Sequence, residues 1–195
     1  MEKGNIRIHK IIDDTCAEGP GRRLVFWVQG CSLHCQGCFE QDTWNHAGGH
    51  LISVDSIVAK VLSNPELEGI TVLGGEPFEQ AGSLALLLEK IRGSQKNSIV
   101  FSGYVYESLK TTNNPDIKRA LAFADLLIDG RFDKNARETK RPMVGSQNQN
   151  FIALSKEGEK LIERLRVYKN RVEIRITKDG TIKVNGMWKK EGDSQ

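Results

Sequence analysis

Short apolar runs alternate with longer amphipathic stretches through the first 130 residues of the chain. Each run is rich in branched or aromatic side chains and ends at glycine or a polar residue, which is typical of buried β-strands. A weaker alternating pattern over residues 6–12 indicates one more strand ahead of them. The predicted buried strands are residues 24–28, 70–73, 99–101 and 126–128.

Apolar residues at helical spacing separate these strands. Ser53 is a suitable N-cap for a helix over about residues 54–62, and a longer helical pattern runs from 78 to about 92. A third helical stretch reaches about Phe123, whereas the Gly and Pro of residues 18–21 predict a tight turn. Because strands that alternate with helices pair in parallel and bind ligands at their carboxyl ends, we expect an α/β fold with its site at that edge.

The pattern changes after Phe151. Residues 156–167 predict an amphipathic helix, and two apolar strands at 172–176 and 181–184 flank Asp179-Gly180, a strong hairpin signal. This tail contains eleven Lys and Arg but only seven Asp and Glu, so it carries the excess positive charge of the whole chain. We therefore expect a main domain at 1–150 and a basic C-terminal extension at 151–195, a helix plus a β-hairpin packed on or next to it.

Composition narrows the class of protein. The chain has 195 residues, of which 38% are hydrophobic and 27% charged, so it suits one folded domain and argues against disorder. Its apolar runs are shorter than the ~20 residues of a membrane span, and the first residues lack the apolar run of a signal peptide. A net charge of +3 is too small to argue for nucleic acid. The expected location is cytoplasmic, with no membrane or nucleic-acid partner.

The four cysteines are unevenly distributed. Cys31, Cys35 and Cys38 lie within eight positions after a predicted strand, whereas Cys16 stands alone. In a reducing compartment such a cluster indicates metal or redox chemistry before disulfides. Three thiolates suit an iron–sulfur cluster with one open position, or a structural zinc site that a fourth ligand such as Cys16 or His34 would close.

A second motif, Gly74-Gly75-Glu76-Pro77, follows the predicted strand at 70–73. Its glycines let backbone carbonyls approach a ligand closely, and Glu76 offers a countercharge to an ammonium group. Glycines are common at the end of a strand, so this motif alone is weak evidence for a ligand site. In combination with the C-x3-C-x2-C spacing of the cysteines, the motif favours an iron–sulfur cluster over zinc.

These two motifs together resemble the radical S-adenosylmethionine superfamily, in which three cysteines hold a 4Fe-4S cluster and the cofactor binds the fourth iron. Many members carry an aromatic residue at the position of Gly37, but the glycyl-radical-enzyme activases of the anaerobic (class III) ribonucleotide reductase are similar to this chain there. Further segments resemble those activases in the same order. They are 18–23 (EGPGRR), 28–31 (VQGC), 43–44 (TW), 102–104 (SGY), 128–132 (IDGRF) and 145–149 (GSQNQ).

The resemblance implies a partial (β/α) barrel of the radical SAM type, with the cluster on Cys31, Cys35 and Cys38. It implies reductive cleavage of S-adenosyl-L-methionine to a 5′-deoxyadenosyl radical, which generates a glycyl radical on the large subunit of the anaerobic reductase. It also implies a flavodoxin or ferredoxin-type electron donor, and no catalytic side chain beyond cluster and cofactor. The expected cofactor-binding residues are Gly37, Gly74, Gly75, Glu76, Ser102 and Asp129.

Several alternatives stay open on the sequence alone. Ser102 and Asp129 can also be turn or cap residues, Cys16 is expected outside the ligand set, and His46 is expected in a solvated turn. The basic run at 131–141 is either a solvated loop or a surface that steers an acidic partner. The other candidate functions are a radical enzyme for a small molecule or peptide, such as a deazaguanine-forming enzyme, and a zinc- or cluster-stabilised binding module. The tail lies beyond the resemblance and is expected to dock a partner.

Overall fold

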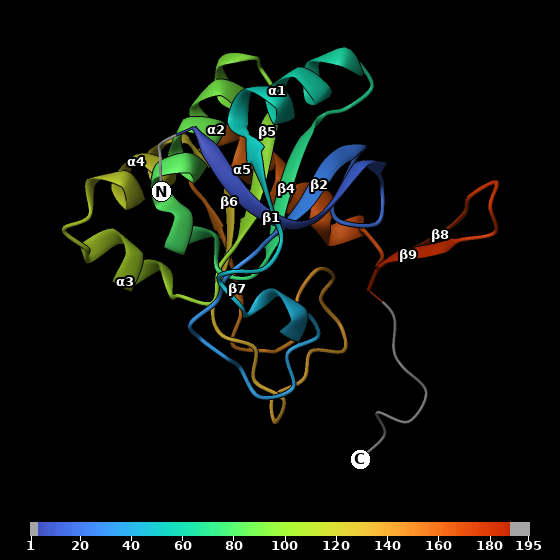
Figure 1. Cartoon of the computed structure of the whole chain (residues 1–195). Coiled ribbons are helices and arrows are strands. Elements are labelled where there is room, and N and C mark those ends of the chain that lie inside the picture. The colour runs from blue at the N-terminus through green and yellow to red at the C-terminus, as the bar shows by residue number, and fades with distance from the viewer. Residues whose placement is uncertain (1–3, 188–195) are drawn as a thin grey trace.

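A computed structural model describes residues 4–187 of the chain (Figure 1). Its centre is a seven-stranded sheet in the order β3-β1-β2-β4-β5-β6-β7, and the four inner strands β2, β4, β5 and β6 run parallel. The parallel strands are β2 (Arg23–Val28), β4 (Gly69–Gly74), β5 (Asn97–Phe101) and β6 (Leu126–Asp129). The antiparallel strands of the sheet are β1 (Asn5–Thr15), β3 (His50–Ser53) and β7 (Asn150–Ala153). The fold is therefore mixed α/β with a mostly parallel central sheet, as expected.

Helices cover both faces of this sheet. Neighbouring residues of β6 enter different apolar clusters, Leu127 one and Leu126 the other, because successive strand side chains point to opposite faces. The first cluster packs under α1 (Val54–Ser63), α2 (Ala81–Gly93) and α4 (Pro115–Phe123), which Figure 1 shows together on one side. The second cluster packs under α5 (Lys156–Val167), whose Leu161 and Leu165 are buried.

Some predicted elements differ in their detail. The pattern at 78–92 divides into a 3-10 turn, η2 (Pro77–Gln80), and α2, and a second short turn, η1 (Gln41–Thr43), follows the cysteines. The stretch that reaches Phe123 is two helices, α3 (Tyr106–Thr111) and α4, because Asn114 caps a new helix that begins at Pro115. The strands β3 and β7 were not expected, since each has only four residues and none of them is fully buried.

A buried arginine stabilises the amino-terminal edge of the parallel strands through hydrogen bonds. Arg23, at the start of β2, is fully buried and donates to Thr71 Oγ1 at 2.8 Å and to the carbonyl oxygens of Ile70 and Pro20 at 2.6 and 3.2 Å. Burial lowers the pKa of its guanidinium to about 9. These neutral acceptors join the turn at 18–21 to β2 and β4.

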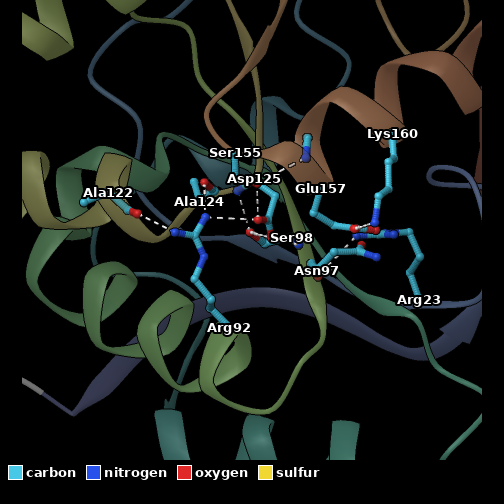
Figure 2. Close-up of polar contacts among 11 residues, drawn as sticks. Arg23, Arg92, Asn97, Ser98, Ala122, Ala124, Asp125, Ser155, Glu157 and Lys160 are labelled. Carbon is cyan, nitrogen blue, oxygen red and sulfur yellow. Dashed lines mark hydrogen bonds and ion pairs between the residues drawn. The ribbon is translucent and has the colours of Figure 1, made fainter.

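Asp125 forms a second polar centre at the same edge, just before β6 (Figure 2). Its carboxylate accepts from Ser98 N at 2.9 Å, from an Arg92 guanidinium nitrogen at 3.0 Å and from Ser155 Oγ at 2.6 Å. Ser155 is also the N-cap of α5, so one carboxylate connects β5, α2 and α5. The edge opposite the strands' carboxyl ends is thus held by buried polar contacts.

The C-terminal residues form two different structures. β7 pairs with β6 and α5 packs on the sheet, so the expected boundary at residue 150 falls directly at the start of a strand of the main sheet. β8 (Val172–Ile176) and β9 (Ile182–Gly186) instead form a separate two-stranded sheet, the red hairpin that points away from the body in Figure 1. Within residues 4–187, no helix has the length and apolar character needed to cross a membrane.

Candidate functional site

The carboxyl ends of β2, β4, β5 and β6 surround a pocket of about 210 Å³. Trp27, Leu73 and Phe101 form part of its apolar wall. Seven of the residues expected at the site line this pocket. They are Cys31, Cys35, Cys38, Gly74, Gly75, Glu76 and Ser102.

The loop that carries the cysteines begins with a glycine in the left-handed region. Gly30 has φ +100°, and a Cβ at this position would lie 2.8 Å from Cδ2 of His46. Gly30 N donates to Thr43 O at 2.7 Å, and Cys31 N donates to Trp44 O at 3.2 Å. The loop therefore folds back on the segment around η1, which turns the thiol of Cys31 into the pocket.

The donor set of the pocket fits an iron–sulfur cluster. Burial raises the pKa values of the Cys31 and Cys38 thiols, so an unliganded site favours the neutral thiol. All three cysteines are free of disulfides. Among residues 4–187, no three Cys, His, Asp or Glu side chains gather closely enough for a single metal ion. Three thiols spread around one pocket suit the larger body of a cluster, whose iron atoms stabilise the thiolate form.

The Gly74-Gly75 segment makes a close backbone contact with the cysteine loop. Gly75 N donates to Val28 O at 2.9 Å, and Glu76 N donates to Gly30 O at 2.8 Å. A Cβ on Gly75 would lie only 2.2 Å from Gly30 O. Only glycine permits this approach, which keeps the segment beside Cys31 and along the pocket wall.

Glu76 lies at the pocket wall, and its part in cofactor binding stays a prediction. Its side chain is fully buried, and its carboxylate accepts from Phe78 N at 3.0 Å, Ser102 Oγ at 2.9 Å and Gly103 N at 2.8 Å. Burial raises the pKa of this carboxyl to about 7 in spite of these donors. Glu76 therefore fixes the loop after β5 against the loop after β4, and its hydrogen bonds go to protein donors.

Ser102 and Asp129 make turn and cap contacts, and their part in cofactor binding stays a prediction. The Ser102 hydroxyl donates to Glu76 and accepts from Tyr104 N at 3.0 Å, as in a turn. Asp129 accepts from Tyr106 N at 2.6 Å and so caps the first turn of α3. Gly130, rather than Asp129, lines the pocket.

Gly37 is not among the residues that line the pocket, and it lies against the loop at 130–149. A Cβ there would meet Phe132 at 3.4 Å and Lys134 at 3.5 Å, so the loop at 130–149 closes over the cysteine loop at this glycine. Next to it, Phe39 is 61% exposed and contacts the edge of the Phe132 ring, with centroids 5.7 Å apart. This aromatic pair forms one rim of the pocket mouth.

Glu79 was not among the residues expected at the site. Its carboxylate accepts from Ser32 N at 2.9 Å and contacts His46 Nε2 at 2.8 Å, so the residue after Cys31 is tied to η2 and to the segment at 46. His46, expected in a solvated turn, is one partner of this bridge. The residues lie 33 and 47 positions from Glu79, and no local pattern marks such contacts.

His34 and Cys16 do not join the thiols. His34 stacks on Trp44 with ring centroids 4.6 Å apart. Cys16 lies outside the pocket and beside the hairpin, where its backbone N donates to Glu173 Oε1 at 2.7 Å. The split of three cysteines plus one, read from spacing, is therefore also a split in space.

Comparisons with known proteins agree with this site. A family model described as a 4Fe-4S single cluster domain matches residues 17–152. The anaerobic ribonucleoside-triphosphate reductase-activating protein of Enterobacteria phage T4 is 33% identical over 138 residues, which are 67% of this chain and 83% of the relative. The protein of the same name from Vibrio cholerae is 27% identical, over 72% of this chain and 94% of its own.

An activase named for a different enzyme also matches. The pyruvate formate-lyase-activating enzyme of Clostridium pasteurianum is 34% identical over 117 residues, which are 55% of this chain and 49% of that enzyme. The region that the family model matches contains the four parallel strands, the cysteine loop and the Gly-Gly segment, and it ends before α5. This chain therefore belongs to the 4Fe-4S single-cluster family of glycyl-radical-enzyme activases that includes the anaerobic ribonucleoside-triphosphate reductase-activating proteins.

Proposed function

We propose that this chain is the radical SAM activase of an anaerobic ribonucleoside-triphosphate reductase. Cys31, Cys35 and Cys38 hold the 4Fe-4S cluster, and S-adenosyl-L-methionine binds in the same pocket. The observation that carries the proposal is the meeting of three free thiols and the Gly74-Gly75 backbone at the carboxyl ends of parallel strands. A structural zinc site would need no such glycine segment beside it.

The chain's own residues bind and shield the reacting groups. A reduced cluster held by Cys31, Cys35 and Cys38 would supply one electron for the reductive cleavage of S-adenosyl-L-methionine, and so the radical chemistry that acts on a glycine of the reductase. Trp27, Leu73 and Phe101 line the inner wall with apolar surface that excludes water from a reactive radical. Gly74 and Gly75 bring backbone polar groups to the cofactor, and Glu76 holds the adjoining loop in place.

The proposal extends to the fold and the partners. The curved, mostly parallel sheet is the partial (β/α) barrel of the radical SAM type. The protein substrate is the large subunit of the anaerobic reductase, and a flavodoxin or ferredoxin-type protein is the electron donor. The reductase enters at the mouth of the pocket, between the cysteine loop and the loop at 130–149.

Anaerobic reconstitution tests this function. The chain is loaded with iron and sulfide, reduced with dithionite and mixed with S-adenosyl-L-methionine, and 5′-deoxyadenosine is quantified by chromatography. We expect turnover by the native chain and by Cys16→Ala, and its loss in Cys31→Ala, Cys35→Ala and Cys38→Ala. A fully loaded, reduced native chain that forms no 5′-deoxyadenosine would refute the proposal.

Electron paramagnetic resonance then identifies the substrate. Addition of the reductase subunit should produce a glycyl radical signal in proportion to the cofactor cleaved. Cofactor cleavage without a glycyl signal would instead indicate a radical enzyme for a small molecule or peptide. Stoichiometric zinc without iron or sulfide would indicate a binding module.

A further inference from the structure

The C-terminal hairpin exposes its apolar side and turns its polar side toward the body, the reverse of most hairpins on a protein surface. Antiparallel strands usually turn their apolar face inward and their polar face to solvent. Here the apolar side chains point away from the body and are between 42% and 71% exposed. They are Val172, Ile174, Ile176, Ile182 and Val184, called the hairpin face below.

The inner side of the hairpin is polar and is fixed to β1 by hydrogen bonds. Glu173 Oε1 accepts from Cys16 N at 2.7 Å, and Asn185 Nδ2 donates to Thr15 Oγ1 at 3.0 Å. Arg175 donates to the carbonyl oxygen of Asp14. Side chains alternate along a strand, so these anchors force the intervening Val and Ile residues outward.

Exposure of the hairpin face has a free-energy cost that a partner would remove. Burial of a branched apolar side chain is favourable, and five of them form one continuous surface. An isolated two-stranded hairpin is itself only marginally stable in water. Contiguous exposed apolar surface of this kind marks an interaction site.

The position of the hairpin connects it to the pocket. Gly186, the last residue of β9, donates its N–H to Glu18 Oε1 at 2.7 Å. Met187 follows directly and lines the pocket that holds the three thiols. The segment that leaves the hairpin therefore reaches the pocket, while the hairpin itself is anchored beside the amino-terminal end of β2. The hairpin is also outside the region at 17–152 that the family shares.

Charge decides between a second copy of this chain and a different protein. Glu173, Arg175 and Lys183 stand on the inner side of the hairpin. The other charged residues of 168–187 lie at the two ends of the hairpin and have a net positive charge, with Lys169, Arg171 and Lys178 against Asp179. Two such hairpins face to face would bring like charges together, which is unfavourable. A partner with carboxylates around an apolar patch would be attracted instead.

We propose that the hairpin face docks the protein substrate of the activase through an apolar patch rimmed by carboxylates. Docking tethers the substrate to the activase, so that its glycine segment is kept close to the pocket that Met187 lines. The inference rests on the proposed function, because it assigns a surface to the substrate of that same site.

The double variant Ile176→Thr/Ile182→Thr tests the docking surface. These two residues are cross-strand partners, and threonine keeps the β-branched shape that strands favour. Val167→Thr is the matched control, since Val167 is 83% exposed at the end of α5 and outside the hairpin. Each reconstituted holoenzyme is titrated with the purified glycyl-radical subunit of the reductase in an anaerobic binding assay.

We expect binding to weaken by about tenfold or more in the double variant and to stay unchanged in Val167→Thr. Binding of the native chain should also weaken as salt rises, because the basic side chains at the ends of the hairpin attract the carboxylates of the partner. Formation of 5′-deoxyadenosine with dithionite and no reductase should be equal in all three proteins. This separation distinguishes docking from the chemistry of the pocket.

Equal binding by the double variant and the native chain would overturn the docking proposal and leave the proposed function intact. A free chain that sediments as a dimer, and as a monomer only in the double variant, would assign the surface to a second copy. A hairpin face that binds an apolar dye only after removal of residues 188–195 would assign it to the chain's own end. If the native holoenzyme cleaves no cofactor and gives no glycyl signal, the proposed function itself fails.

Discussion

Helix α5 and the hairpin follow each other in the chain and use their apolar residues in opposite ways. Leu161 and Leu165 of α5 are buried against the sheet, whereas Ile174 and Ile176 of β8 face solvent. Both segments have clear apolar periodicity. The difference shows that a periodic pattern predicts an element with an apolar face but does not say whether that face meets the same chain or another one.

Truncation of one apolar side chain in each segment should give the largest difference between them, measured as the free energy of unfolding. Leu161→Ala leaves a cavity in the cluster under α5, so we expect the free energy of unfolding to fall by about 2–5 kcal/mol. Ile174→Ala on the hairpin should change it by less than about 0.5 kcal/mol, apart from a small loss of strand propensity. Urea denaturation measures both. Similar losses in the two variants would mean that the hairpin face is covered within the free chain.

Two buried carboxyls should make stability depend on pH, one at the pocket and one at the hairpin. Burial raises the pKa values of Glu76 and of Glu18 from 4.5 to about 7. The folded state therefore holds these protons more tightly, and the stabilisation present below pH 4.5 is lost as pH rises through about 7. Each group contributes at most about 3 kcal/mol to this loss.

Replacement of each carboxyl by glutamine shows which region causes the loss of stability at higher pH. Glu76→Gln should remove the part that belongs to the pocket, and Glu18→Gln the part that belongs to the hairpin anchor at Gly186. Urea midpoints between pH 4.5 and 8 measure the slope in each variant. A slope that neither variant reduces would contradict the assignment.

A methyl group at Gly75 should disturb the pocket and leave the hairpin intact. Its Cβ would collide with Gly30 O, so Gly75→Ala forces apart the segments that flank Cys31 and should cost about 1–3 kcal/mol. Iron content after anaerobic reconstitution should fall below half of the native value. Gly93→Ala is the control, because nothing lies within 4 Å of that position and the change should be neutral or slightly stabilising. Full iron loading of Gly75→Ala would show that the loop can move without loss of the site.

Two carboxylates that accept from a backbone N–H near a cysteine give the finest comparison. Glu79 accepts from Ser32 N beside the cluster ligands, and Glu173 accepts from Cys16 N beside the hairpin. Each change to glutamine should cost about 1 kcal/mol, because the charge-assisted bond becomes a neutral one. Glu79→Gln should speed the loss of iron to a chelator, whereas Glu173→Gln should not. Equal chelator rates in the two variants would remove Glu79 from the support of the cysteine loop.

Local patterns were sufficient for much of the fold and for part of the site. The apolar runs predicted β2, β4, β5 and β6, and Ser53 predicted the start of α1. The cysteines and Gly74-Gly75 were found because each motif is short and continuous in sequence. Their meeting in one pocket follows from the parallel order of the strands, whose carboxyl ends share one edge.

Contacts between distant segments could not be predicted in the same way. The bridge from Glu79 to His46 and the hydrogen bonds of Glu76 to Ser102 and Gly103 depend on how three loops pack together. The edge strands β3 and β7 have only four residues each, too few to show a clear alternation of apolar and polar positions. The outward hairpin face also lay beyond the sequence, because alternation gives two faces and only the anchors to β1 choose between them.

The backbone contact between Gly75 and Gly30 also limits where the chain can change in length. The bonds Gly75 N to Val28 O and Glu76 N to Gly30 O continue the ladder of β2 and β4 beyond the strands. One inserted residue on either side would shift this register and separate the cysteine loop from the glycine segment. Insertions and deletions among relatives should therefore collect elsewhere, in the loop at 130–149 and at the hairpin, where different protein substrates can be accommodated without a change to the pocket.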